Sequence, residues 1–398
     1  MGEHELRRAA QAQADAVVAF CQRLIRTPGL PGAEGAVAAL VRAEMESLGY
    51  DDVWTDEAGN VVGCVRGAGG ASLMLNTHLD HVAAGNPDRW PVPPFGGEVK
   101  DGAVWGRGAM DIKGPLACQV HAPAVLRRAG IPPAGDVYVT AVVMEEVGGV
   151  GARVLLERLR PDLAVVGEAT SCDVARGHRG RVELQVRFVG RSAHASAPER
   201  AANPHYAAAR FLTALRDLEM VASLTFGPAT VAPTLVASDQ SSANVTPGEL
   251  LLTLDWRTVP EEGPDAVLAR VAELAAAAAG EGVAADARVR SSAWETYTGL
   301  VAETPSIHGA FVLERDHPLV EGAVAAIEGA FGASVGTRLW RFATDGGHFM
   351  DAGVPTIGFA PGDETLAHTH EERIGLDELA QGLLGNAALC AHLGEVRL

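Results

Sequence analysis

The sequence predicts an α/β protein whose mostly parallel sheet carries helices on both faces, with an α+β domain containing an antiparallel sheet inserted into it. Short apolar runs rich in β-branched residues, such as residues 137–144 and 163–166, alternate with helical segments, which is typical of a parallel sheet covered on both faces. Residues 181–189 instead alternate between polar and apolar side chains, which is typical of an antiparallel strand with one wet face. With 398 residues, the chain is long enough for two domains.

Helices are expected in the first part of the chain where apolar residues recur at helical spacing between breakers such as Gly49 and Gly130. They cover about residues 5–26, 35–48, 115–129 and 152–159. Strands are expected where the apolar runs are short and β-branched. They cover residues 61–65, 72–75, 137–144 and 163–166.

The inserted domain is predicted to cover residues 180–292, a plausible size for a separate unit. After the alternating strand at 181–189, its elements are a helix, a strand, an Ala-rich helix and a last strand. These cover about residues 204–218, 249–256, 264–279 and 283–289. The first domain is therefore discontinuous, covering residues 1–179 and 293–398, and it resumes with a buried strand at 353–360 and a helix at 374–393.

The composition excludes several classes of function. The net charge of −18, from 50 acidic and 32 basic residues, argues against a nucleic-acid partner and against an anionic membrane surface. The N-terminus is charged and amphipathic rather than apolar, so we expect no signal peptide, and no apolar run is long enough to span a bilayer. The five cysteines form no CxxC pair and are odd in number, which favours a reducing cytoplasm over a disulfide framework.

Glu145 and Glu146 stand side by side after the apolar run at 137–144. Two carboxylates held at close range raise each other's pKa. Because successive side chains of an extended chain point in opposite directions, the two cannot easily do the same task. We therefore expect one carboxylate to hold a cation and the other to reach toward a reacting water.

Other side chains that bind metals also follow predicted strands. His78 comes just after the strand at 72–75, with Asp80 two residues further on, where a carboxylate can orient an imidazole. Glu168 follows the strand at 163–166. In an open α/β sheet the functional site lies at the carboxyl ends of the strands, so these residues are expected to meet.

Two more candidates complete the set. Asp111 lies in a Gly-rich loop just before a helix, where an N-cap role is the alternative. His368 follows the strand at 353–360. Together with His78, Glu146 and Glu168, they provide two imidazoles and three carboxylates, enough for two zinc ions that share one carboxylate and keep open positions for water.

Six segments, in the same order along nearly the whole chain, resemble the motifs of one known family. They are Thr77–Val82, Gly106–Gly114, Met144–Glu146, Gly167–Ala169, Gly190–Pro198 and Ala367–His368. The resemblance is to the M20 family of metallopeptidases and deacylases, which includes acetylornithine deacetylase, succinyl-diaminopimelate desuccinylase, aminoacylase-1 and the glutamate carboxypeptidases.

The resemblance implies a role for each residue of the site. It implies that His78 and Glu168 bind one zinc ion, that Glu146 and His368 bind the other, and that Asp111 bridges them. Cobalt or manganese are expected to substitute for zinc. Glu145 is implied to be the general base and then the general acid, and Asp80 to hold His78 in its ligating tautomer and to tune Glu145.

The resemblance also implies roles for the insert, which in this family is a lid domain that often forms a dimer interface. His194 resembles a histidine that reaches the active site of a neighbouring subunit and stabilises the oxyanion. Asn244 and Arg257 resemble lid residues that hold the carboxylate of the substrate, a task suited to the planar fork of an arginine. We therefore expect a homodimer that forms through residues 180–292.

The sequence departs from the family pattern in two places. Desuccinylases carry an arginine soon after a Ser-Asp-Gly segment, whereas Ala343–His348 contains none, so succinyl-diaminopimelate is not the expected substrate. A proline that often follows the last ligand is also missing, which leaves His370 as an alternative to His368. His81 is a weaker alternative to His78.

The sequence therefore predicts a cytoplasmic di-zinc amidohydrolase that acts on an N-acyl amino acid or on a small peptide with a free carboxylate. In this reaction Glu145 takes a proton from a water held between the metals and returns it to the leaving amine. The alternative is a catalytically inactive binding or regulatory protein on the same fold. The intact set of candidate ligands argues against it, because an inactive copy has no chemical need to keep them.

Overall fold

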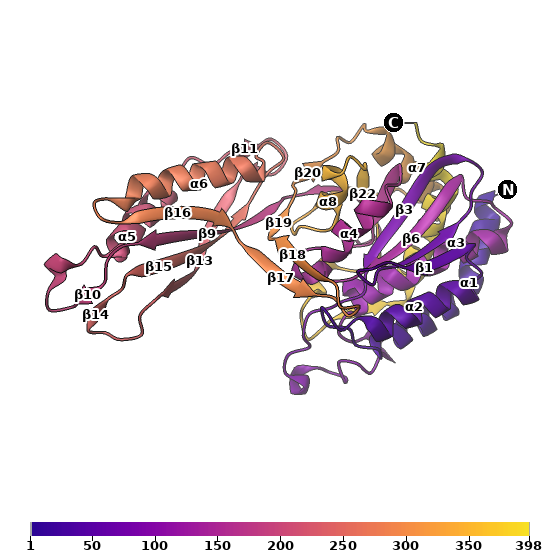
Figure 1. The fold of residues 1–398 in the computed structure, drawn as a ribbon. Helices are drawn as coiled ribbons and strands as arrows, with labels where there is room; N and C mark the ends of the chain where they lie inside the picture. Colours follow the sequence, from indigo (N-terminus) through magenta and orange to yellow (C-terminus); the bar gives the residue numbers. More distant parts are fainter. Residues whose placement is uncertain (1, 398) are drawn as a thin grey trace. The chain divides into compact units, whose positions relative to one another are not determined.

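The computed structural model describes residues 2–397, which form two compact units (Figure 1). The first unit comprises the chain up to His178, the segment Ala293–Ala302 and the chain from Val312 onward. The second unit comprises Arg179–Ser292 and Glu303–Phe311. The sequence prediction placed residues 303–311 in the first domain, but here they join the second unit because Ile307 and His308 pair with Val182 and Arg181.

The first unit is built on a nine-stranded sheet with a mostly parallel centre. Along the sheet, the strands are β1 (Asp52–Thr55), β2 (Val61–Val65), β6 (Gly135–Val142), β3 (Gly70–His78), β7 (Leu163–Val166), β22 (Thr356–Gly358), β8 (Val174–His178) and β20 (Phe311–Val312), with β21 (Thr337–Trp340) paired to β8. The neighbours β6, β3, β7 and β22 run parallel, and so do β8 and β21. The pairs β1–β2, β2–β6 and β22–β8 are antiparallel. The central strands are buried, as their unbroken β-branched runs predict.

Helices cover both faces of this sheet, which confirms the predicted fold class. The larger layer contains α1 (Gly2–Ile25), α2 (Gly35–Ser47), α3 (Gly114–Ala129), α7 (Pro318–Phe331) and α9 (Leu376–His392). The opposite layer contains α4 (Val150–Arg158) and α8 (Gly346–Asp351). Leu155 of α4 and Phe349 of α8 belong there to one hydrophobic cluster with Met74 of β3. The next residue of β3, Leu75, belongs to the core of the larger layer, so this strand contributes to two cores.

The second unit is an antiparallel sheet covered by two helices. Its strands, in order, are β13 (Thr230–Ser238), β15 (Glu249–Arg257), β9 (Arg181–Val189) and β16 (Ala284–Val289), with β19 (Ile307–His308) also paired to β9. The helices α5 (Pro204–Arg216) and α6 (Pro264–Ala279) share one hydrophobic core with alternate residues of β9 and β15. This is the arrangement that the alternating pattern at 181–189 predicts.

The remaining elements are short. They are β4 (Glu98–Lys100), β5 (Ala103–Trp105) and β23 (Arg373–Gly375) in one small sheet, the pairs β10 (Ala193–His194) with β14 (Val245–Thr246), β11 (Ala222–Ser223) with β12 (Gly227–Pro228) and β17 (Ser291–Glu295) with β18 (Val301–Pro305), and the single turns of helix η1 (Pro87–Arg89), η2 (Ala109–Lys113), η3 (Glu145–Val147), η4 (Pro198–Arg200), η5 (Glu364–Leu366) and η6 (Leu393–Glu395).

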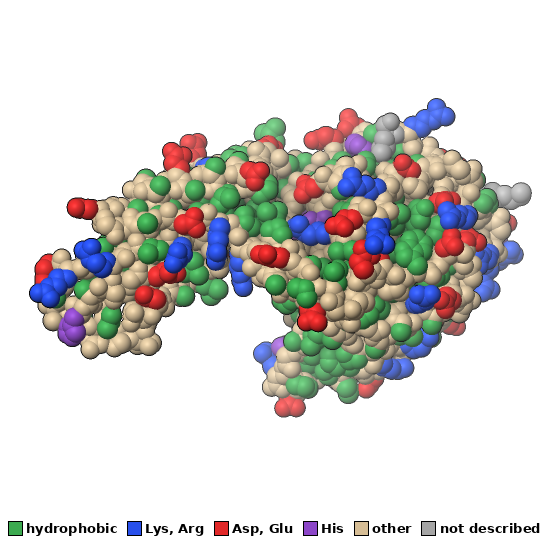
Figure 2. Space-filling view, viewed as in Figure 1, with side chains coloured by type: hydrophobic (Ala, Val, Ile, Leu, Met, Phe, Trp, Pro, Cys, Tyr) green, Lys and Arg blue, Asp and Glu red, His purple; other side chains and the backbone are tan. Residues whose placement is uncertain are grey.

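Charged side chains of both signs are mixed on the surface, and the cysteines lie in the interior. On the face shown in Figure 2, Lys and Arg side chains are scattered among Asp and Glu and form no broad basic patch. All five cysteines are free and buried. Among residues 2–397, no helix combines the length and apolar character that a bilayer crossing requires.

Candidate metal centre

The parallel register of three strands brings the predicted ligands to one edge of the sheet. His78 is the last residue of β3 and lies opposite Val142, the last residue of β6. On the other side of β3, Val166 at the end of β7 lies opposite Asn76. The residues that follow β6 and β7 therefore emerge beside His78, as expected for the carboxyl ends of parallel strands.

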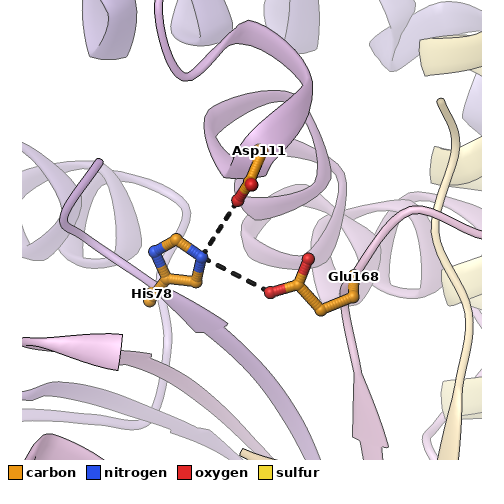
Figure 3. Close-up of side chains that lie close together, drawn as sticks. All are labelled: His78, Asp111 and Glu168. Atoms are coloured by element: carbon orange, nitrogen blue, oxygen red, sulfur yellow. Dashed lines mark ion pairs between the residues drawn. The ribbon is translucent and has the colours of Figure 1, made fainter. Parts of the chain in front are cut away.

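The first group of ligands contains His78, Asp111 and Glu168 (Figure 3). The Nε2 atom of His78 lies 3.2 Å from Oδ1 of Asp111 and 3.4 Å from Oε1 of Glu168. This Nε2 is buried and has no hydrogen-bond partner among the described residues. A buried nitrogen that faces two carboxylate oxygens without bonding to either fits a site that holds a cation between them.

The second group contains Asp111, Glu146 and His368. The Nε2 atom of His368 lies 3.0 Å from Oδ2 of Asp111 and 3.0 Å from Oε1 of Glu146. The two oxygens of Asp111 thus face different groups, Oδ1 toward His78 and Oδ2 toward His368. Asp111 is therefore a member of both groups.

The electrostatics of the two groups favour bound cations. Burial lowers the pKa of His78, but Asp111, Asp80 and Glu168 outweigh burial and raise it well above 6.5. Hydrogen bonds to Asp111 and Glu146 raise the pKa of His368 to about 10. Burial, and then the charge of Asp111, raises the pKa of Glu168 to about 7, although His78 opposes this shift. The carboxylates outnumber the imidazoles, so two divalent cations would relieve their mutual repulsion.

Glu145 and Glu146 leave the sheet in a different way from the predicted one. The strand β6 ends at Val142, not at Met144, and the two glutamates form the first part of the 3₁₀ turn η3. On a 3₁₀ turn, successive side chains diverge by about 120°. This divergence, rather than the alternation of a strand, lets Glu146 face His368 while Glu145 lines the same cavity. Burial, followed by the charges of Asp345, Glu168 and Glu146, raises the pKa of Glu145 well above 4.5, against the opposing effect of His78.

Asp80 contacts both His78 and the glutamate turn. Nδ1 of His78 lies 3.0 Å from the main-chain oxygen of Asp80 and 3.4 Å from its Oδ1. The main-chain N–H groups of Glu145 and Glu146 donate to Oδ1 and Oδ2 of Asp80, each at 3.1 Å. The main-chain oxygen of Asp80 is therefore nearer to the His78 imidazole than the Asp80 carboxylate is, and it orients the ring. The carboxylate stabilises the turn that carries Glu145 and Glu146.

The loop that carries Asp111 is held by Glu372, which the sequence analysis did not identify as part of the site. Oε1 of Glu372 accepts the N–H groups of Met110 and Asp111 at 3.2 and 3.1 Å, and Oε2 pairs with Nη1 of Arg107 at 2.5 Å. On the other side of the loop, Lys113 donates to the main-chain oxygens of Leu24 and Thr27. Glu372, Arg107 and Lys113 are buried. They fix the position of the shared carboxylate.

The two competing histidines lie outside the ligand groups. His370 packs edge-on against Trp90, with 5.9 Å between the ring centroids. Nε2 of His81 accepts the N–H of Gly29, and burial lowers the pKa of His81 to about 4. Among the described residues, His368 and His78 are the histidines that join the carboxylates.

An open cavity of about 230 Å³ is lined by all three residues of the second group. Its wall combines site carboxylates with apolar side chains. It is formed by Met110, Asp111, Glu145, Glu146, Glu168, Ala169, Phe342, Ala343, Glu364, Ala367 and His368. No Lys or Arg is among these lining residues, in keeping with the absence of an arginine from Ala343–His348.

The predicted lid residues lie in the second unit. His194 is exposed in β10, and its Nδ1 lies 2.7 Å from Oγ of Ser196. Asn244 is exposed and lies next to β14, where it forms a hydrogen bond with Ser242. Arg257 ends β15 and donates to both carboxylate oxygens of Asp255, at 2.6 and 3.3 Å. The roles assigned to these three residues remain predictions.

Comparison with known proteins identifies the family. The profile of "Peptidase family M20/M25/M40" matches residues 74–390, which include every candidate metal ligand. The chain belongs to this family. Its members are hydrolases that act on amide or peptide bonds, so the enzyme class predicted from the sequence is confirmed.

Several individual proteins resemble this member of the family over nearly its whole length. The uncharacterized protein YgeY of Escherichia coli (strain K12) is 30% identical over 374 residues, covering 92% of each chain. An N-formyl-4-amino-5-aminomethyl-2-methylpyrimidine deformylase of Halalkalibacterium halodurans is 28% identical, covering 92% of this chain and 91% of its own. A succinyl-diaminopimelate desuccinylase of Phenylobacterium zucineum is also 28% identical, covering 94% and 97%. Among solved structures, the aminopeptidase PepT of Bacillus cereus has a TM-score of 0.75 at 21% identity, covering 95% and 98%, and so shares the fold.

Proposed function

We propose that this M20-family chain is a di-metal amidohydrolase that cleaves the amide bond of an N-acyl amino acid or of a small peptide with a free carboxylate. The observation that carries the proposal is the pair of ligand groups that share Asp111 beside the Glu145 carboxylate. Each group offers one imidazole nitrogen and two carboxylate oxygens, a donor set that fits zinc with a coordination position left open. Cobalt or manganese would accept the same donors.

The bound cations would supply Lewis acidity, which makes a water acidic near neutral pH and polarises an amide carbonyl. His78, Asp111 and Glu168 would hold one cation, and Asp111, Glu146 and His368 the other. Glu145 lines the cavity without belonging to either group, so its carboxylate is free to take the proton of the attacking water. The same carboxylate then delivers the proton to the leaving amine nitrogen as the carbon–nitrogen bond breaks.

Three residues of the second unit, His194, Asn244 and Arg257, are proposed to act on the substrate. The three predicted lid residues would take its carboxylate and the developing oxyanion. Asp255 occupies two of the five N–H donors of Arg257, so further donors remain for a substrate carboxylate. The exposure of His194 supports the proposal that it acts toward the active site of a second copy of the chain.

A homodimer that forms through the second unit is also proposed. The strand β13 lies at the edge of its sheet, and its only strand neighbour in that sheet, within residues 2–397, is β15. Its side chains Leu235 and Val236 are 63% and 67% exposed. An exposed apolar edge of this kind is a template for pairing with another chain, which supports a dimer at this strand.

The direct test is a comparison of the wild-type protein with Glu145→Gln. N-acetyl amino acids and dipeptides are screened first, and metal content is measured on the same preparations. We expect Glu145→Gln to keep about two metal ions per chain and to lose hydrolysis by roughly 10²–10⁴-fold, the usual contribution of a general base. Near wild-type turnover in this variant would remove Glu145 from the mechanism. A wild-type protein that binds metal but hydrolyses none of the amides would favour the alternative of an inactive binding protein.

A further inference from the structure

The turn that carries Glu145 and Glu146 has a backbone that needs support. Between β6 and η3, Met144 adopts φ 57° and ψ 36°, in the left-handed region. For a residue with a side chain, this conformation costs on the order of 1–2 kcal/mol. The turn therefore depends on contacts with other parts of the chain.

Two buried carboxylates provide these contacts for three successive N–H groups. Asp80 accepts from Glu145 and Glu146, as described above. Oε1 of Glu34 accepts the N–H of Met144 at 3.2 Å. Glu34 and Asp80 are both 0% exposed. The backbone of the turn thus rests on acceptors from two distant segments.

Besides the N–H of Met144, the Glu34 carboxylate is engaged by its own main-chain N–H and by that of Gly32. Glu34 stands immediately before α2, but its side chain does not cap that helix. The following Gly35 lies under the ring of Tyr297, so closely that a Cβ there would lie 3.0 Å from Cδ2 of that ring. A carboxylate that is fully buried to accept a few main-chain N–H groups costs more free energy than a well-packed apolar residue would. The N–H of Met144, which the Glu34 carboxylate accepts, explains why a glutamate is buried at this position.

We propose that Glu34 is a positioning residue for the Glu145–Glu146 pair. By accepting the Met144 N–H, Glu34 holds Met144 in its left-handed conformation, from which Glu146 turns toward His368 and Glu145 toward the cavity. The catalytic consequence rests on the proposed function. The consequence for the backbone of the turn does not, because it concerns a hydrogen bond of the chain itself.

The test uses three variants of Glu34 in the full-length protein. Glu34→Gln keeps an acceptor oxygen at the same reach, Glu34→Asp keeps the charge but shortens the reach by one methylene, and Glu34→Leu removes the acceptor. A matched control is Glu262→Leu, which removes another buried glutamate, one that accepts the Nε1–H of Trp256 in the second unit.

Two measurements decide the outcome. Hydrogen exchange of the peptide spanning residues 143–147 is expected to speed up in Glu34→Leu and Glu34→Asp, and to stay as in wild type in Glu34→Gln and Glu262→Leu. Titration with Co²⁺ is expected to show one of two equivalents weakened by roughly 10–100-fold in Glu34→Leu and Glu34→Asp, as is usual when a group that orients a metal ligand is lost. Where an amide substrate is found, kcat is expected to fall in Glu34→Leu and Glu34→Asp, with little change in KM.

Wild-type exchange and wild-type Co²⁺ affinity in Glu34→Leu would overturn the proposal. If Glu34→Leu does not fold, the same result in Glu34→Asp overturns it. Equal damage in Glu34→Gln and Glu34→Leu would also overturn it, because the acceptor would then not be what matters. If the wild-type protein turns over no amide, the proposed function fails, whereas the exchange comparison still decides the role of Glu34.

Discussion

The substitution Glu372→Leu tests whether a buried ion pair holds the Asp111 loop. Glu372 is 0% exposed and its partner Arg107 is 3% exposed, so the carboxylate and the guanidinium are both removed from water. The same carboxylate accepts the N–H groups of Met110 and Asp111. Removing it leaves one buried cation and two N–H groups without their acceptor.

The size of the effect follows from these contacts. An unpaired buried charge costs about 3–5 kcal/mol, and each N–H that loses its acceptor about 1–3 kcal/mol. Because all three losses come from one carboxylate, they overlap, and we expect the free energy of unfolding to fall by about 4–6 kcal/mol. The double variant Arg107→Leu with Glu372→Leu is expected to regain about 2 kcal/mol or more, since it no longer buries an unpaired charge.

The assay is urea unfolding of the metal-depleted protein at pH 8. That pH lies above the value of about 7 to which burial and then Asp111 raise the pKa of Glu372, so the carboxylate is ionised. The exposed neighbour Glu371→Leu serves as the matched control, with a change within about 0.5 kcal/mol. A loss below about 1 kcal/mol in Glu372→Leu, or a double variant no more stable than the single one, would show that the buried ion pair does not hold the Asp111 loop.

Three further predictions concern the site and the assembly. His368→Ala is expected to lose about one of two bound metal ions, whereas His370→Ala keeps both, as measured by elemental analysis; equal losses would contradict the assignment. The folded-state pKa values of Glu168 and His368, about 7 and about 10, lie above their ordinary values of 4.5 and 6.5. Their stabilising contribution is therefore present at low pH and is lost as the pH rises through those values, so the Tm of the metal-depleted protein should fall between pH 6 and 9 while metal affinity increases. A Tm that stays constant between pH 6 and 9, together with a metal affinity that falls over this range, would contradict this prediction. Finally, Val236→Glu is expected to convert a dimer into monomers in light scattering, and an unchanged mass would exclude β13 from the interface.

Local patterns were sufficient to predict much of the fold and the ligand set. The strand Leu163–Val166 and the helix Pro264–Ala279 have the bounds that their sequence predicts. The first is a β-branched run buried in a parallel sheet, and the second begins with proline and ends before glycine. The ligands could be proposed because each follows a predicted strand or precedes a predicted helix, and parallel strands bring such positions together.

Other features depend on contacts that no local pattern shows. Glu34 and Met144 are 110 positions apart, and Glu372 and Met110 are 262 apart, so nothing in the adjacent residues marks either glutamate as an acceptor. The strand β13 was not predicted because it contains Pro233 and is exposed along most of its length, which leaves no alternation to detect. The end of β6 was predicted two residues late, since the apolar character of residues 143 and 144 continues into the turn.

Two ligand groups that share Asp111 are proposed to hold two catalytic metal ions. Calorimetric titration of the metal-depleted protein with Zn²⁺ at pH 8 measures how many ions they bind. The structure leads us to expect about two equivalents per chain in the wild-type protein, and fewer in Asp111→Ala because that substitution removes a ligand from both groups. A wild-type protein that binds no Zn²⁺, or an Asp111→Ala variant that binds two equivalents as tightly as wild type, would exclude these two groups as the metal sites.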